Sequence, residues 1–130
     1  MVESTSASSV SNGGKVPIPI GHDHLQLKHD EVIMNKLQKN EHIVFSCKVM
    51  KYNRFGIKQD RFLLLSTQKL CNVKKQEFKR EIKIYDIEAL TKSTEANNME
   101  FIVHIKDAYD YRFICEQRDE LFEQIKAVYF

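Results

Sequence analysis

The 130-residue sequence lacks a long hydrophobic run, since no apolar stretch approaches the ~20 residues that a transmembrane helix needs. Its N-terminus has neither the basic start nor the apolar core of a signal peptide. Val2 occupies the position where myristoylation requires glycine, and the C-terminus has no prenylation box. These absences predict a cytoplasmic protein without a lipid anchor of its own.

Motifs that carry catalysis are missing too. The sequence contains no Gly-x-Ser-x-Gly, no phosphate-cradling glycine loop and no His-Glu-x-x-His. It has only four glycines. We therefore expect no catalytic residues, no cofactor and no enzymatic activity.

Cysteine is scarce, with three residues and no Cys-x-x-Cys pair. All three lie in apolar or alternating runs, which predicts buried free thiols in a reducing compartment: Cys47, Cys71 and Cys115.

A metal site is also not indicated. His22, His24 and His29 lie close to two aspartates, but their spacing gives no i, i+4 histidine pair on a helix, and no cysteine joins them. The sequence therefore predicts no metal ligands.

The net charge of +2 conceals a strong asymmetry along the chain. Residues 48–83 contain 11 Lys and Arg against 3 Asp and Glu, whereas residues 84–130 contain 5 against 10. The first of these stretches is a candidate surface for an anionic partner.

Residues 1–22 are rich in Ser and Gly and have few bulky side chains, so we expect a disordered tail. Residues 23–130 then form one domain. A short helix is predicted over residues 30–40, because Val32, Ile33 and Leu37 lie one turn apart and Asp30 can cap the first turn.

After residue 40 the hydrophobic period changes to two, and the chain between about 42 and 115 reads as seven short strands. The helical period returns over residues 117–129, where Leu121, Ile125 and Val128 share one face. This order predicts a mainly β (α+β) fold, a curved sheet or barrel capped by a C-terminal helix. The predicted strands cover residues 43–49, 61–66, 70–73, 78–84, 87–93, 99–105 and 109–115.

The first predicted hairpin is basic. Its cations could gather around a polyanion, with Arg offering a planar fork and Lys a point charge to phosphate oxygens. Composition alone favours the simpler alternative, a solvated basic hairpin without a ligand. The candidate lipid- or anion-binding residues are Lys48, Lys51, Arg54, Lys58 and Arg61.

The same hairpin carries a family resemblance. Residues 51–67 read KYNRFGIKQDRFLLLST, which resembles the opening hairpin of the tail homology 1 (TH1) domain of class I myosins. Residues 78–82, 84–90 and 101–105 resemble later segments of that domain in the right order. The resemblance extends over about residues 25–130.

The resemblance implies a pleckstrin-homology-like (PH-like) fold, a seven-stranded curved sheet closed by a C-terminal helix. It also implies peripheral binding of acidic phospholipids, including phosphoinositides, with Lys51 and Arg61 as lipid residues and Lys58 at a further basic position. The sequence departs from the family pattern at Gln59, where a basic residue is usual, and Asp60 follows it.

Two functions follow as alternatives. The first is a membrane-associated phospholipid-binding module of the cytoplasm or cytoskeleton. The second is a protein-binding scaffold without lipid binding, which Gln59, Asp60 and the acidic second half favour. The sequence has no motor and no calmodulin-binding helix, so we expect a protein partner. Nucleic acid is disfavoured, because Tyr52 and Phe55 are the only aromatic candidates for base stacking. The sequence does not specify an oligomeric state.

Overall fold

A computed structural model describes residues 2–3 and 22–129. The predicted disordered tail therefore lies outside the described residues, apart from β1 and His22. In chain order the elements are β1 (Val2–Glu3), a 3-10 turn (Leu27–His29), α1 (Glu31–Met34), β2 (Ile43–Tyr52), β3 (Lys58–Ser66), β4 (Lys69–Lys74), β5 (Glu77–Lys83), a 3-10 turn (Ile84–Asp86), β6 (Ile87–Lys92), β7 (Glu100–Ile105), β8 (Tyr111–Ile114) and α2 (Arg118–Tyr129).

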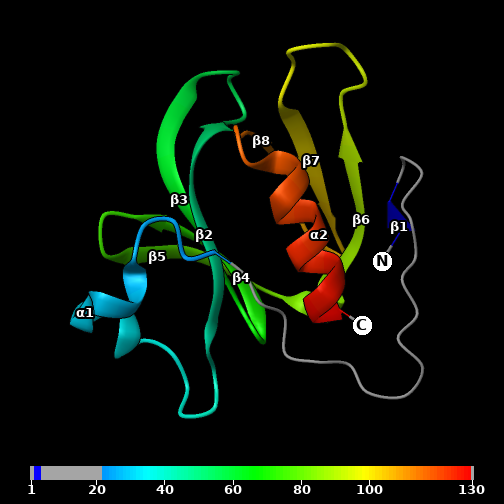
Figure 1. Ribbon diagram of the computed structural model, residues 1–130. Coiled ribbons are helices and arrows are strands. Elements are labelled where there is room, and N and C mark those ends of the chain that lie inside the picture. The colour runs from blue at the N-terminus through cyan, green and yellow to red at the C-terminus, as the bar shows by residue number, and fades with distance from the viewer. Residues whose placement is uncertain (1, 4–21, 130) are drawn as a thin grey trace.

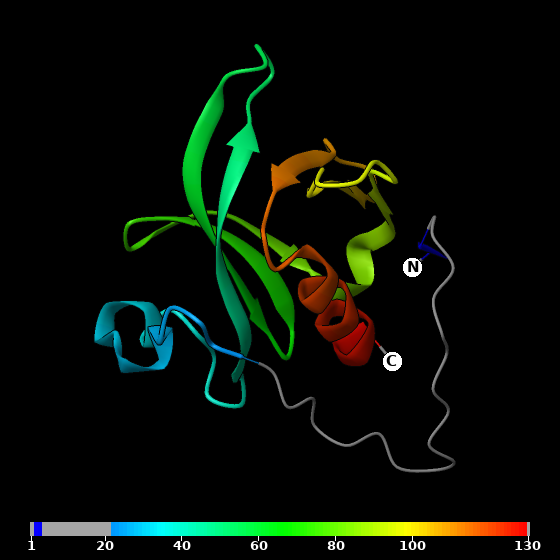
Figure 2. The same ribbon diagram turned by 45° about the horizontal axis from the view of Figure 1, so that its top comes forward.

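The strands form one curved sheet in the order β1-β6-β7-β8-β2-β3-β4-β5 (Figure 1). Strands β2 to β8 pair antiparallel, and the two-residue β1 pairs parallel with β6. Seven antiparallel strands followed by a C-terminal helix confirm the predicted fold class. The β2–β3 hairpin is longer than predicted and projects beyond the rest of the sheet (Figure 2).

Helix α2 packs against the concave face of the sheet (Figures 1 and 2). Its predicted apolar face is confirmed, because Leu121 and Ile125 are buried and Val128 packs at the edge of the same core. Phe122 is buried beside them, and its ring meets that of Phe101 edge-on at 5.5 Å between centroids. The helix is therefore part of the main core and not an appendage.

A second, smaller apolar cluster covers the convex face of the sheet. The segment that precedes β2 places Leu27 and Ile33 against Leu64, Cys71 and Val73. Strand β2 therefore buries both of its faces over residues 44–47, where simple alternation was predicted. Alternation along a strand predicts one buried face. Burial of the opposite face depends on a segment from elsewhere in the chain that packs on it.

Helix α1 ends at Met34 and not at Asn40, so its predicted extent was wrong. Its predicted cap is present, because the Asp30 carboxylate accepts hydrogen bonds from the backbone N–H groups of Val32 and Ile33. Beyond Met34 the chain continues in turns while Leu37 still packs on the convex cluster. Packing against the curved sheet outweighs the helical preference of these residues.

The three cysteines are free and buried, as predicted. The Cys47 and Cys115 sulfurs lie 3.3 Å apart in the main core. Burial raises the pKa of Cys71 to about 12, and the hydrogen bond with Cys115 raises the pKa of Cys47. Cys47 and Cys71 are therefore protonated at neutral pH and are not reactive thiolates.

We expect the substitution Phe122→Ala to lower the free energy of unfolding by about 3–5 kcal/mol, because it leaves a cavity between α2 and the sheet. Urea denaturation followed by circular dichroism measures the change. Tyr109→Ala serves as the control, since Tyr109 is 88% exposed and its truncation should change stability by less than about 0.5 kcal/mol. Equal stabilities of the two variants would contradict a structural role for α2.

Candidate functional site

The pairing of β2 with β3 decides which face each hairpin side chain reaches. Directly opposed residues point to the same face of a sheet, and the face alternates along the strand. Val49 lies opposite Arg61, and Lys51 lies opposite Gln59, in the same alternation as the core residue Cys47. The side chains of Lys51 and Arg61 therefore share the concave face.

The other predicted site residues lie elsewhere. Lys48 pairs with Phe62 and Lys58 with Tyr52, so these two lysines point to the convex face. Arg54 lies in the turn, where its guanidinium stacks 4.9 Å from the centroid of the Phe55 ring. The structure thus divides the five predicted residues among two faces and a tip, and brings only Lys51 and Arg61 together.

A third cation, Arg80 of β5, joins the concave face. Arg80 pairs with Asn72 of β4, which pairs in turn with the core residue Leu63. The guanidinium of Arg80 and the ammonium of Lys51 lie 4.5 and 5.4 Å from the centroid of the same ring, that of Tyr111. We call Lys51, Arg61 and Arg80 the inner basic cluster.

Sequence analysis did not include Arg80 among the site residues. The signal that could have found it was alternation carried across two strand pairings, from Arg61 of β3 through β4 to β5. That inference needs the register of both strand pairings, and a bulge between Asn72 and Val73 shifts the register of the β4–β5 pairing.

Beside the inner basic cluster lie polar atoms without a protein partner. Asn72 is only 1% exposed, and neither its Nδ2 nor its Oδ1 has a hydrogen-bond partner among the described residues; the same holds for Nε of Arg61. The Arg61 Nη atoms donate to the Asp60 carbonyl at 2.7 Å and to Gln59 Oε1 at 3.4 Å. A buried amide without a hydrogen-bond partner costs about 1–3 kcal/mol of stability.

Within the described part of the chain, no carboxylate lies within ion-pair distance of the inner basic cluster. The acidic Asp60 pairs with Met50 and therefore points to the convex face, away from Lys51 and Arg61. Asp60 therefore lies on the other face of the sheet, whereas Gln59, the departure from the family pattern, lies opposite Lys51 on the concave face beside the inner basic cluster.

The cations of the convex face do have an internal carboxylate. Arg112 of β8 donates to Glu100 at 2.7 Å, and this hydrogen bond holds the pKa of Glu100 below its usual value. The Arg112 guanidinium and the Lys58 ammonium both lie over the Tyr52 ring, at 4.0 and 5.8 Å from its centroid. The positive potential on this side is therefore partly neutralised.

The tip of the β2–β3 hairpin is apolar as well as basic. Phe55 is 72% exposed and Ile57 is 59% exposed. The Asn53 side chain fixes the turn, because its Oδ1 accepts from the backbone N–H groups of Phe55 at 2.9 Å and Ile57 at 3.0 Å. Gly56 adopts a φ of 76°, which a residue without Cβ tolerates.

Residues 21–130 match the family described as "Unconventional myosin tail, actin- and lipid-binding". The chain belongs to this myosin TH1 family. The predicted family is thereby confirmed, and so is the prediction of a non-catalytic binding module.

Solved structures show that this TH1 domain has the PH fold. The C-terminal domain of an unknown protein from Leishmania infantum has a TM-score of 0.58 at 14% identity, over 68% of this chain and 84% of that one. The PH domain of human oxysterol binding protein-related protein 11 has a TM-score of 0.54 at 16% identity, over 71% and 82% of the two chains. The Slm1 PH domain, solved with D-myo-inositol-4-phosphate, has a TM-score of 0.52 at 12% identity, over 64% and 92%.

A comparison with curated protein sequences gives no match. Among the described residues of this TH1 domain, no helix is both long and apolar enough to span a bilayer.

We expect Asn72→Leu, which keeps the branching of the side chain, to raise the free energy of unfolding by about 1 kcal/mol or leave it unchanged, because it removes unpaired buried polar atoms. Urea denaturation measures this. The matched control is Asn53→Leu, which breaks two hydrogen bonds in the TH1 hairpin turn and should destabilise the domain. A large loss of stability in the Asn72 variant would show that its amide is satisfied.

Proposed function

We propose that this domain binds the headgroups of anionic phospholipids, including phosphoinositides, at a cytoplasmic membrane surface. The observation that carries the proposal is the inner basic cluster, in which Lys51, Arg61 and Arg80 share one face without an internal carboxylate. The family description as lipid-binding supports the same conclusion.

The cluster suits a phosphate. The guanidinium groups of Arg61 and Arg80 offer planar pairs of donors, and Lys51 adds a compact charge. Each basic residue near an anionic surface contributes about 1 kcal/mol, so three to five of them produce reversible, salt-sensitive binding.

The apolar tip fits the same orientation. Phe113 of β8 pairs with Lys51, so the loop before Tyr111 lies at the same end of the sheet as the hairpin turn. That end therefore carries the exposed side chains of Phe55, Ile57 and Tyr109 together with Arg54. Aromatic and apolar side chains flanked by cations favour the interface between lipid headgroups and acyl chains.

The proposal predicts a membrane-peripheral domain formed by residues 23–130. Vesicle sedimentation tests it, with phosphatidylcholine vesicles that contain phosphatidylserine or a phosphoinositide, at several salt concentrations. The double variant Lys51→Glu/Arg61→Glu should reduce binding at least about tenfold, because it places carboxylates in the inner basic cluster.

The matched control is Lys48→Glu/Lys58→Glu, which changes the net charge equally but on the convex face. We expect a smaller loss of binding from the control. Equal losses from both double variants would show that only net charge matters, and an absence of wild-type binding at low salt would refute the lipid function.

A second function rests on a different surface. The turn between β4 and β5 presents the exposed Lys74 and Lys75 around a depression that Lys36, Lys79 and Val32 of α1 also line. One carboxylate, that of Glu77, lines it too and pairs with Lys79 at 3.2 Å, so the excess of charge is positive. This surface suits an acidic protein partner, and the family is described as actin-binding as well as lipid-binding.

Co-sedimentation with actin filaments tests this second function. We expect Lys74→Glu/Lys75→Glu to weaken filament binding several-fold, whereas the Lys51→Glu/Arg61→Glu variant retains most of it. Filament binding that responds equally to both variants would contradict a separate protein surface, and no filament binding by the wild-type chain would exclude actin as the partner.

A further inference from the structure

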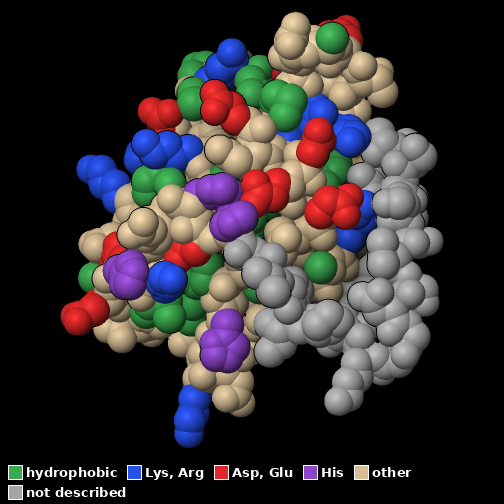
Figure 3. Space-filling model, in the orientation of Figure 1, with side chains coloured by type: hydrophobic (Ala, Val, Ile, Leu, Met, Phe, Trp, Pro, Cys, Tyr) green, Lys and Arg blue, Asp and Glu red, His purple; other side chains and the backbone are tan. Residues whose placement is uncertain are grey.

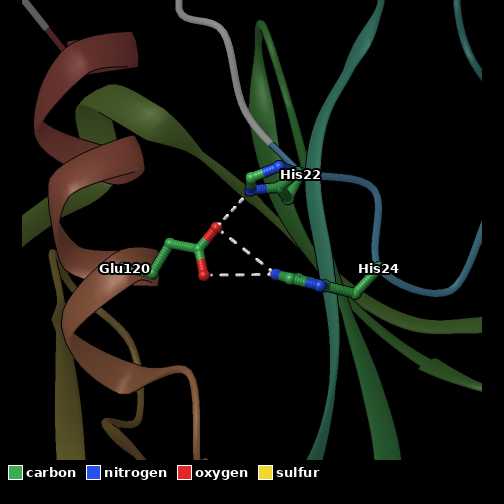
Figure 4. Close-up of side chains that lie close together, drawn as sticks. All are labelled: His22, His24 and Glu120. Carbon is green, nitrogen blue, oxygen red and sulfur yellow. Dashed lines mark hydrogen bonds and ion pairs between the residues drawn. The ribbon is translucent and has the colours of Figure 1, made fainter.

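Three potential metal ligands meet where the segment before β2 touches α2 (Figure 4). Nδ1 of His22 lies 2.8 Å from Oε1 of Glu120, and Nε2 of His24 lies 3.2 Å from Oε2 of the same carboxylate. The prediction from the sequence was that His22 and His24 are not metal ligands. Glu120 follows them by 98 and 96 residues, so its position beside them could not be inferred along the chain. In the space-filling view, histidine side chains lie beside acidic ones near the middle of this face (Figure 3).

The spacing of these atoms suits a small tetrahedral ion. Donor atoms bound to Zn²⁺ at about 2.0–2.1 Å lie roughly 3.4 Å from one another in a tetrahedron. All three donor atoms lie within 4.8 Å of one another, and the two histidine–carboxylate contacts are 2.8 and 3.2 Å. The two histidine–carboxylate contacts are slightly shorter than this spacing, and the three donor atoms lie close enough together to share one ion.

The backbone that carries the histidines is held in place. The Ser46 N–H of β2 donates to the His22 carbonyl at 3.0 Å, and the Asp23 carboxylate accepts from the N–H of Leu27 at 2.9 Å. The ring of His24 packs edge-on against the buried ring of Phe45, with 5.2 Å between centroids. The Asp23 carboxylate is thus engaged in a hydrogen bond with the backbone, which helps to keep His22 and His24 directed toward α2.

Glu120 is fixed from the other side. It lies in the first turn of α2, directly before Leu121 and Phe122, which are buried in the main core. The burial of these two neighbours fixes the backbone from which the Glu120 side chain reaches the histidines. A preorganised donor set of this kind binds metal with little cost in side-chain ordering.

We propose that His22, His24 and Glu120 form a binding site for a divalent transition metal ion, with Zn²⁺ as the best match. Two imidazoles and one carboxylate favour Zn²⁺ over Mg²⁺ or Ca²⁺, which prefer oxygen ligands alone. The fourth position faces solvent, since the His22 side chain is 76% exposed, and it is open to water. Bound metal ties the start of the domain to its last helix.

Isothermal titration of the full chain with zinc chloride, after removal of any histidine tag, tests the site. We expect one Zn²⁺ per chain and a thermal unfolding midpoint that rises with zinc concentration, because the metal binds the folded state. Calcium and magnesium chloride should produce neither effect. His24→Ala and Glu120→Gln should each weaken zinc binding at least about tenfold.

His29→Ala and His42→Ala are the matched controls, since both histidines are exposed and neither belongs to the cluster. Zinc affinity that falls equally in the controls, or that survives in the His24 and Glu120 variants, would overturn the proposal. X-ray absorption of the zinc-loaded wild-type chain needs no variant and should show two imidazole ligands. No zinc binding at micromolar concentrations would leave the cluster as a hydrogen-bonded strap alone.

Discussion

The register between β2 and β3 is the constraint on which the rest of this structure depends. Because side chains alternate between faces, a slip of β2 by one residue would move Lys51 to the convex face, away from Arg61, and would take Cys47 and Val49 out of the main core. The burial of Phe45 and the other core residues of β2 makes such a slip costly. The apolar core therefore fixes the position of the cations that extend beyond it.

Stability and binding are distributed along the same two strands. Their inner halves lie under α2 and supply much of the main core, whereas their outer halves project from the sheet and carry Lys51, Arg61 and the apolar tip. Asn72 and Nε of Arg61 lie at the boundary between these regions. Buried polar atoms without a hydrogen-bond partner lower the stability of a fold.

Segments distant in the sequence meet in both candidate sites. Arg80 reaches Lys51 across two intervening strands and the ring of Tyr111 on β8, and Glu120 reaches His22 and His24 across the whole domain. Buried Arg118 is a structural counterpart, because its guanidinium donates to the backbone carbonyl of Asn98 at 2.8 Å and holds the β6–β7 loop on α2. Helix α2 thus contributes to the core, holds one loop and carries Glu120 of the cluster with His22 and His24.

The sequence by itself determined the class of the fold. Alternating apolar residues predicted the strands, the helical face of Leu121 and Ile125 predicted the cap, and the hairpin motif predicted the family. These features are local or periodic, so they can be read along the chain. The end of α1, the double burial of β2, the separation of Lys48 and Lys58 from Lys51, and the recruitment of Arg80 and Glu120 were decided only by the tertiary structure. Each of these features depends on which distant segment packs on a face or lies opposite a residue. Strand register and the docking of α2 decide this, and both form only when the chain folds.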